Sequence, residues 1–256
     1  DIQVLREGFP SLKEHCHIVR ATSNHGKMPF AKIGGKKLTK YKSGTKLSGE
    51  AANTEDISYN IENYGALVPI ANDLQEDEAV NIVQDVIKPD FAEAGVNSEN
   101  DEILQIVEAA AVDKSAGVTD WRGVKKVIDG VLPTLRARTI VITNLSGYVY
   151  LQSQEDKNGR NLELVKTVND KDYFQNKRLI TLSDEAITAA EEGAVVFYVV
   201  NLYALVKFFE RKGYTVSTDK SVFFESDELA LKVQERFDCE KLDDRADFKV
   251  EFKPAA

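Results

Sequence analysis

Apolar and polar positions alternate near the start of the chain as they do in β-strands. Residues 28–33 alternate well enough for a short strand, and the strand pattern resumes at residue 57 and runs through residues 66–70. Between them, residues 35–56 are rich in Lys, Gly, Ser and Thr and nearly devoid of large apolar side chains. The pattern predicts two strands joined by a loop of about 20 residues, and loops of that length are usually functional.

A helix is predicted to follow the second strand. Asn72 or Asp73 can cap its N-terminus. Pro89 is expected to kink or interrupt it, because proline removes a backbone donor and its ring clashes with the preceding turn. A second helical run follows over residues 102–112. The apolar face of the first helix carries Val80, Val83 and Ile87.

The second half of the chain has the pattern of a mixed α/β unit in small pieces. The elements expected first are a helix over 121–132, a strand over 139–143, a short helix over 145–153, a turn-rich loop over 154–160, and strands over 179–182 and 194–200. After them come paired strands at 214–217 and 221–225, an amphipathic stretch over 229–237 and a closing strand over 247–253.

Composition places the chain among folded proteins. Its 256 residues are 43% hydrophobic and 29% charged, which is ordinary for a globular domain. No apolar run reaches the roughly 20 residues of a membrane helix, so no membrane is expected. Two cysteines, Cys16 and Cys239, are expected as free thiols in a reducing compartment. The chain begins at Asp1, for which we expect either a trimmed chain or a precursor cut by a protease.

Charge is strongly polarised along the chain. Residues 1–49 carry ten Lys or Arg and three acidic residues, whereas residues 50–110 carry one Lys and fifteen acidic residues. A loop with many lysines and little to bury cannot fold on itself, so we expect it to dock on the acidic segment of a neighbouring copy. The docking lysines are Lys36, Lys37, Lys40, Lys42 and Lys46. Their acidic partners are Glu76, Asp77, Glu78 and Asp85.

Other interpretations of the charged loop and of the histidines stay open. The loop lysines could simply be solvated, or could attract phosphate, although only Tyr41 among them offers a ring for base stacking. The run His15-Cys16-His17, with His25 nearby, would allow a small metal-dependent enzyme. Two ligands at that spacing do not close a tetrahedral site, so surface histidines are the preferred interpretation. The sequence contains no nucleophile elbow, P-loop or dinucleotide fingerprint.

Several segments, taken in order, resemble one known family. Residues 64–77 are similar to a strand that leads into a long helix, and residues 142–148 and 156–162 to a strand, helix and loop of a smaller subdomain. Residues 201–205, 211–216 and 229–238, the last with Glu235-Arg-Phe-Asp238, are similar to a C-terminal pattern. Together these segments resemble the major capsid proteins of tailed bacteriophages with the Hong Kong 97 fold, over roughly residues 28–253.

The resemblance implies an α+β fold with peripheral and axial subdomains. The implied parts are an N-terminal arm (1–27), an extended hairpin loop, the E-loop, with flanking strands (28–72), a spine-helix region of the peripheral subdomain (73–111), an axial subdomain (112–200) and a C-terminal part of the peripheral subdomain (201–256). Two departures stand out: the family's Asn-Gly-x-Gly turn is absent near residues 113–117, and residues 215–229 contain no Asn. We therefore expect no Lys–Asn cross-links between copies.

The function implied is that of a shell protein. Copies would assemble through pentamers and hexamers into the icosahedral head around double-stranded DNA, with no enzyme activity and no cofactor. Expected partners are other copies, a portal, a scaffolding segment or protease during assembly, and packaged DNA bound without sequence specificity. The expected location is the virion, assembled in the host bacterial cytoplasm. An encapsulin-type nanocompartment shell, or another virion structural protein such as a tail or adaptor protein, remains the alternative.

Overall fold

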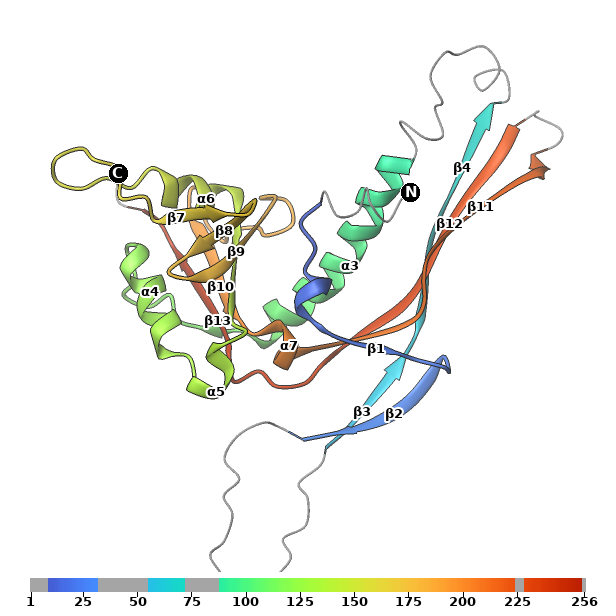
Figure 1. The fold of residues 1–256 in the computed structure, drawn as a ribbon, viewed down its shortest axis with the longest axis horizontal. Coiled ribbons are helices and arrows are strands. Elements are labelled where there is room, and N and C mark those ends of the chain that lie inside the picture. Colours follow the sequence, from blue (N-terminus) through green and yellow to red (C-terminus); the bar gives the residue numbers. More distant parts are fainter. Residues whose placement is uncertain (1–8, 32–54, 72–87, 224–227, 255–256) are drawn as a thin grey trace, which may run out of the picture.

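The computed structural model describes residues 9–31, 55–71, 88–223 and 228–254. The fold is mixed α+β, as predicted. Figure 1 shows a compact body of strands and short helices beside an elongated body, in which a long helix lies along a long, twisted sheet. A two-stranded arm projects from the elongated body.

The elongated body is built on a four-stranded sheet of order β1-β11-β12-β4. Its centre is the antiparallel pair of β11 and β12, which carries register shifts along its length. β4 pairs antiparallel with β12, and β1 pairs parallel with β11. The strands are β1 (His17–Arg20), β4 (Glu62–Ala71), β11 (Val206–Phe223) and β12 (Glu228–Lys241).

The long helix α3 spans Lys88–Ala110 without interruption. Pro89 lies in the first turn of the described helix, where a missing N–H is tolerated. Whether Pro89 interrupts a helix that begins before Lys88 stays a prediction, because residues 72–87 lie outside the described residues. The separate helix predicted over 102–112 is the second half of α3. The part predicted before Lys88, with its apolar face, lies outside the described residues. Buried side chains recur every three or four residues on one face of α3: Phe91, Ala92, Val96, Glu99, Asn100, Ile103, Leu104 and Val107.

The compact body holds a seven-stranded mixed sheet of order β5-β13-β10-β6-β9-β8-β7. Its strands are β5 (Val112–Asp113), β6 (Ile140–Asn144), β7 (Val165–Val168), β8 (Lys171–Phe174), β9 (Lys177–Leu182), β10 (Val195–Val200) and β13 (Asp247–Phe252). Three helices belong to it, α4 (Trp121–Gly130), α5 (Pro133–Arg136) and α6 (Leu145–Gln152), and a fourth, α7 (Leu202–Leu205), leads from β10 into β11.

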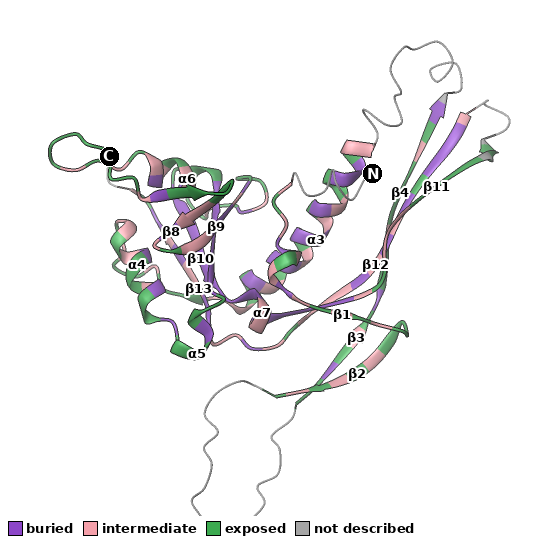
Figure 2. Cartoon of the chain, viewed as in Figure 1, coloured by how far each residue is buried: buried purple, intermediate pink, exposed green. Residues whose placement is uncertain are grey.

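Strand β10 is buried on both faces and separates two hydrophobic cores (Figure 2). On one face its alternate side chains Val196 and Tyr198 join α3 and the long sheet in a shared core. On the other face Phe197 packs with α4 and α6 in an outer core that includes Val124 and Leu151. The shared core therefore links the compact body to the elongated one.

Most elements predicted for the second half of the chain are confirmed. Strands occupy the predicted stretches 139–143, 179–182, 194–200 and 247–253, and helices the stretches 121–132 and 145–153. The pairing of 214–217 with 221–225 is wrong, because residues 214–217 and 221–223 lie in the single strand β11. The polar run between them resembles a turn, but β12 supplies a pairing partner on either side of it. The amphipathic stretch 229–237 belongs to β12.

The projecting arm is the antiparallel pair of β2 (His25–Phe30) and β3 (Glu55–Asn60). This confirms the two strands predicted to flank the lysine-rich loop, while residues 32–54 lie outside the described residues. β3 continues almost directly into β4, so the arm and the long sheet share one length of chain.

An N-terminal arm is expected over residues 1–27, yet from residue 12 onward this stretch packs into the protein. A 3₁₀ turn, η1 (Lys13–His15), precedes β1. Leu12 is fully buried and Cys16 nearly so, and both belong to the shared core. Residues 12–20 are therefore part of the framework of the elongated body.

Candidate functional site

The residues predicted to dock copies together all lie outside the described part of the chain. Lys36, Lys37, Lys40, Lys42 and Lys46 fall within 32–54, and Glu76, Asp77, Glu78 and Asp85 fall within 72–87. Their contact therefore stays a prediction. The structure does describe the framework that carries both segments: the arm, the start of α3, and the long sheet between them.

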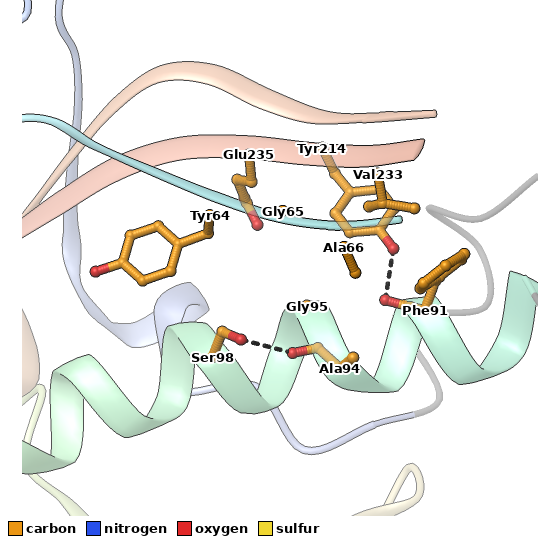
Figure 3. A pocket seen from close by; sticks show the side chains of 10 residues that line it. All are labelled: Tyr64, Gly65, Ala66, Phe91, Ala94, Gly95, Ser98, Tyr214, Val233 and Glu235. Atoms are coloured by element: carbon orange, nitrogen blue, oxygen red, sulfur yellow. Dashed lines mark hydrogen bonds between the residues drawn. The ribbon is translucent and has the colours of Figure 1, made fainter. Parts of the chain in front are cut away.

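Helix α3 meets the long sheet across a close seam (Figure 3). A Cβ on Gly95 of α3 would lie 2.8 Å from Cε2 of Tyr214, so only glycine allows this approach. The Tyr214 hydroxyl donates a hydrogen bond to the Phe91 carbonyl at 2.5 Å. Further along the seam, the Tyr64 hydroxyl donates to Glu102 at 3.0 Å.

A partly open cavity of about 190 Å³ lies at the seam. That volume is below the range of about 300–1,000 Å³ that is usual for small-molecule sites. The cavity is therefore better explained as imperfect packing between helix and sheet than as a ligand site. It is lined by Tyr64, Gly65, Ala66, Phe91, Ala94, Gly95, Ser98, Tyr214, Val233 and Glu235 (Figure 3).

A charged cluster binds the N-terminal stretch to the same seam. The Lys13 ammonium lies 2.6 Å from Glu99 of α3, 2.8 Å from Glu210 of β11 and 3.4 Å from Glu235 of β12. Glu99 and Glu235 are almost completely buried. Burial alone would lower the pKa of Lys13, but the nearby carboxylates, Glu99 foremost, outweigh it, so the pKa of Lys13 lies above its ordinary value. One ammonium thus connects a helix and two strands.

Asn100 fixes the N-terminal stretch at a second point. Its Oδ1 accepts a hydrogen bond from the Leu12 N–H at 2.9 Å, and its Nδ2 donates to the Pro10 carbonyl at 2.8 Å. Because one amide satisfies both a donor and an acceptor, the backbone at Pro10 and Leu12 is held against α3. The sequence carries no signal for this contact, since the partners are about 90 residues apart.

The base of the arm is fixed to the long sheet. Tyr59 of β3 stacks on Phe209 of β11, with ring centroids 4.4 Å apart. The Asn60 N–H donates to the Asp238 carboxylate at 2.7 Å, and the Arg236 guanidinium donates to Asn24 at 3.1 Å. Burial raises the pKa of Asp238, and the bond from Asn60 opposes that rise. The arm therefore leaves the body from a defined base.

His17 and Cys16 of the N-terminal stretch are engaged in packing. The His17 ring stacks on the Tyr203 ring, with ring centroids 4.8 Å apart. The Arg138 guanidinium lies 3.9 Å from the centroid of the Tyr203 ring. Burial, with Lys207 and Arg138 nearby, lowers the pKa of His17. The Cys16 thiol donates to the Leu12 carbonyl. Within the described ranges, no three His, Cys, Asp or Glu side chains are placed to hold a metal ion.

Two adjacent chain segments connect the bodies, and an unusual carboxyl lies beside them. The Asn201 N–H donates to the Ala246 carbonyl at 3.0 Å, and the Leu242 N–H donates to the Leu205 carbonyl at 2.6 Å. Asp247, directly after Ala246, is fully buried, and neither carboxyl oxygen has a hydrogen-bond partner among the described residues. Burial, with Asp244 nearby, raises the pKa of Asp247 to about 8.

The comparisons with known proteins decide the family. The model of the family described as "Phage capsid family" matches residues 11–251. This chain belongs to the phage capsid family. The resemblance seen in the sequence is thus confirmed. No curated protein sequence matches the chain. Within the described residues, no helix is long and apolar enough to cross a membrane.

Solved structures of capsids and related particles share the fold of this capsid protein. The capsid of an empty GTA particle matches with a TM-score of 0.69 and 14% identity, over 95% of this chain and 90% of that one. A structure from Microbacterium phage Oxtober96 matches with a TM-score of 0.67 and 13% identity, over 96% and 92%. A virus-like particle from Pyrococcus furiosus matches with a TM-score of 0.62 and 13% identity, over 97% and 95%. The capsid fold thus extends over nearly the whole chain.

Proposed function

We propose that this capsid protein builds the icosahedral head shell of a tailed phage, assembling through pentamers and hexamers around double-stranded DNA. The observation that carries the proposal is the arrangement of two bodies that share a core, with an arm that projects from them (Figure 1). The anchored base at Tyr59 and Asn60 directs the arm away from its own body. An arm of this kind has its surface available to another copy.

The lysine-rich segment 32–54 lies at the end of that arm in sequence, and the acidic segment 72–87 lies between β4 and α3. We infer that the first docks on the second in a neighbouring copy, with Lys36, Lys37, Lys40, Lys42 and Lys46 facing Glu76, Asp77, Glu78 and Asp85. Repeated heterologous contacts of this kind close into rings. Many modest contacts in a closed lattice then give a stable shell.

The proposed role is mechanical, with no catalytic step and no cofactor. The net charge of −9 suits an inner wall that does not grip packaged DNA. Other copies are the main partners; a portal, and a scaffolding segment or protease, would take part during assembly in the bacterial cytoplasm.

Electron microscopy of the purified protein tests the proposal. Negative-stain images should show closed shells, and particles from infected cells should hold nuclease-protected DNA. Stable monomers, or open tubes and isolated rings as the end product, would count against a head shell. Particles that protect protein cargo and no DNA would favour the second candidate, an encapsulin-type compartment. That candidate is kept because the virus-like particle from Pyrococcus furiosus has the same fold.

A further inference from the structure

Helix α6 presents an apolar stripe directly away from the core. Leu145 is 52% exposed and Val149 is 56% exposed, and their i, i+4 spacing puts them on one face. Gly147 and Leu151 occupy the opposite, buried face. The helix contains no charged residue. Single exposed apolar residues are ordinary, but two adjacent ones on an uncharged helix form a surface that burial would stabilise.

A partly apolar hollow lies on the other side of the same sheet, at its edge strand β7. Its volume is about 630 Å³. Val168, at the end of β7, is 54% exposed, and Leu162 is 37% exposed. Val165 packs in the outer core beneath the helices, and Val168, three residues later, points to the opposite face. The hollow is lined by Leu162, Glu163, Leu164, Lys166, Val168, Tyr173, Gln175 and Asn176.

The stripe and the hollow thus occupy opposite faces of one sheet. Leu151 of α6 belongs to the outer core, which places α6 on the face away from the hollow. Two such surfaces cannot meet within one chain, and a two-fold contact would pair stripe with stripe. A contact of stripe with hollow is heterologous, and repeating it with a fixed rotation closes a ring.

Charges around the two surfaces are complementary. In the sheet register Val168 pairs with Lys171, and Lys166 lies two residues before it on the same strand. Beside Leu145, the backbone N–H and hydroxyl of Ser146 both donate to Asp184, which is exposed. Docking the stripe into the hollow would bring Asp184 toward the two lysines, although Glu163 of the hollow opposes part of this attraction.

We propose that the stripe formed by Leu145 and Val149 of one copy docks into the β7 hollow of the next copy around each ring of the shell. The occupant of the hollow is therefore a second copy of this chain. This inference rests on the proposed shell function. It adds a specific ring contact, made by the compact body, to the contact expected from the arm.

A cysteine pair tests the geometry in assembled particles. Val149→Cys and Val168→Cys are introduced in one chain, and particles are oxidised with copper phenanthroline. Two thiols then lose two protons and two electrons, two Cu²⁺ ions are reduced to Cu⁺, and one S–S bond forms between copies. We expect a non-reducing gel ladder that ends at complete pentamers and hexamers. Each single variant should stay monomeric on the gel.

Matched controls set the background. Pairing Val149→Cys with Val222→Cys uses a residue of equal exposure, 55%, on distant β11 and should give no ladder. The native chain should also stay monomeric, because Cys16 is buried and Cys239 is largely shielded. A cross-linked dimer from Val149→Cys alone would indicate stripe-to-stripe contact and overturn the proposal. Monomers from the double variant in intact particles would overturn it as well.

A second variant covers the case in which cysteine disturbs assembly. Leu145→Ser with Val149→Ser removes the apolar stripe from a solvent-facing helix surface, so the melting temperature should be nearly unchanged. The threshold concentration for assembly should rise about tenfold or more, because the apolar burial is lost. Unchanged assembly would overturn the proposal. If the unmodified chain forms no particles under any condition, the shell function itself fails, which is a separate result.

Discussion

The ammonium of Lys13 lies 2.6 Å from Oε1 of Glu99, joining the N-terminal stretch to α3 across 86 residues of sequence. The same ammonium reaches Glu210 and Glu235 on the two central strands of the long sheet. This one side chain therefore ties the N-terminal stretch to α3 and to the two central strands of the long sheet.

Removing that ammonium should destabilise the protein. Lys13→Met leaves three carboxylates close together, two of them buried, so unfolding in urea should show a loss of about 3 kcal/mol. The matched control Lys125→Met changes an exposed lysine of α4 and should cost less than about 0.5 kcal/mol. Equal losses in the two variants would mean that the cluster adds no stability.

The buried Asp247 should make stability depend on pH. The unfolded carboxyl releases its proton near the ordinary value of about 3.9, whereas the folded one keeps it until about pH 8. The unfolded state therefore binds fewer protons between these values, and the contribution of Asp247 to stability falls as pH rises from 4 to 8.

Asp247→Asn should remove this dependence. Near pH 4 the variant and the parent should have similar free energies of unfolding, because Asp247 is neutral in the folded state. At pH 8 the variant should have a free energy of unfolding higher by about 3 kcal/mol. This value is set below what the full pKa difference of Asp247 between the folded and unfolded states would give. Denaturant unfolding at several pH values measures the difference, with exposed Asp129→Asn as control. A difference that is constant with pH would contradict the account.

The seam between α3 and the sheet should not tolerate a methyl group at Gly95. Alanine is better than glycine in a helix by about 1 kcal/mol, yet its Cβ would lie 2.8 Å from the Tyr214 ring. We therefore expect Gly95→Ala to lower the melting temperature. Gly130→Ala, at the end of α4 with nothing within 4 Å, should be neutral or stabilising. A stabilising Gly95→Ala would show that Tyr214 moves aside at little cost.

Charge reversal of the lysine-rich segment 32–54 should block assembly without unfolding the subunit. Replacing Lys36, Lys37, Lys40, Lys42 and Lys46 with Glu should leave the circular dichroism spectrum of the monomer unchanged and abolish shells. Raising the salt concentration should weaken assembly of the parent chain, because salt screens exposed charges. Normal shells from the charge-reversed variant would contradict the electrostatic docking model.

The sequence pattern was sufficient where a segment's own side chains decide its structure. The apolar run 194–200 predicts a strand, and the structure has β10 there, between two cores. The alternation in 247–253 predicts a strand with Phe248, Val250 and Phe252 on one face, and all three pack in the outer core. The capsid family was likewise recognisable from the ordered segments.

Contacts between residues far apart in the sequence could not be predicted from the hydrophobic pattern. Strand β1 has four residues and no alternation of its own, and its place beside β11 depends on Lys13 and Asn100 reaching distant partners. The single long β11 looked like two strands, because its polar middle is stabilised by β12 and not by its own composition. The predicted docking residues are supported by charge alone, since they lie outside the described residues.

The path of the lysine-rich segment 32–54 in an assembled particle tests the central claim most directly. A cryo-electron microscopy reconstruction of shells formed by the purified chain would show where residues 32–54 of each copy lie. The account predicts a closed shell in which they contact residues 72–87 of the next copy. If residues 32–54 contact only their own chain, or if the assembly never closes, the account is contradicted.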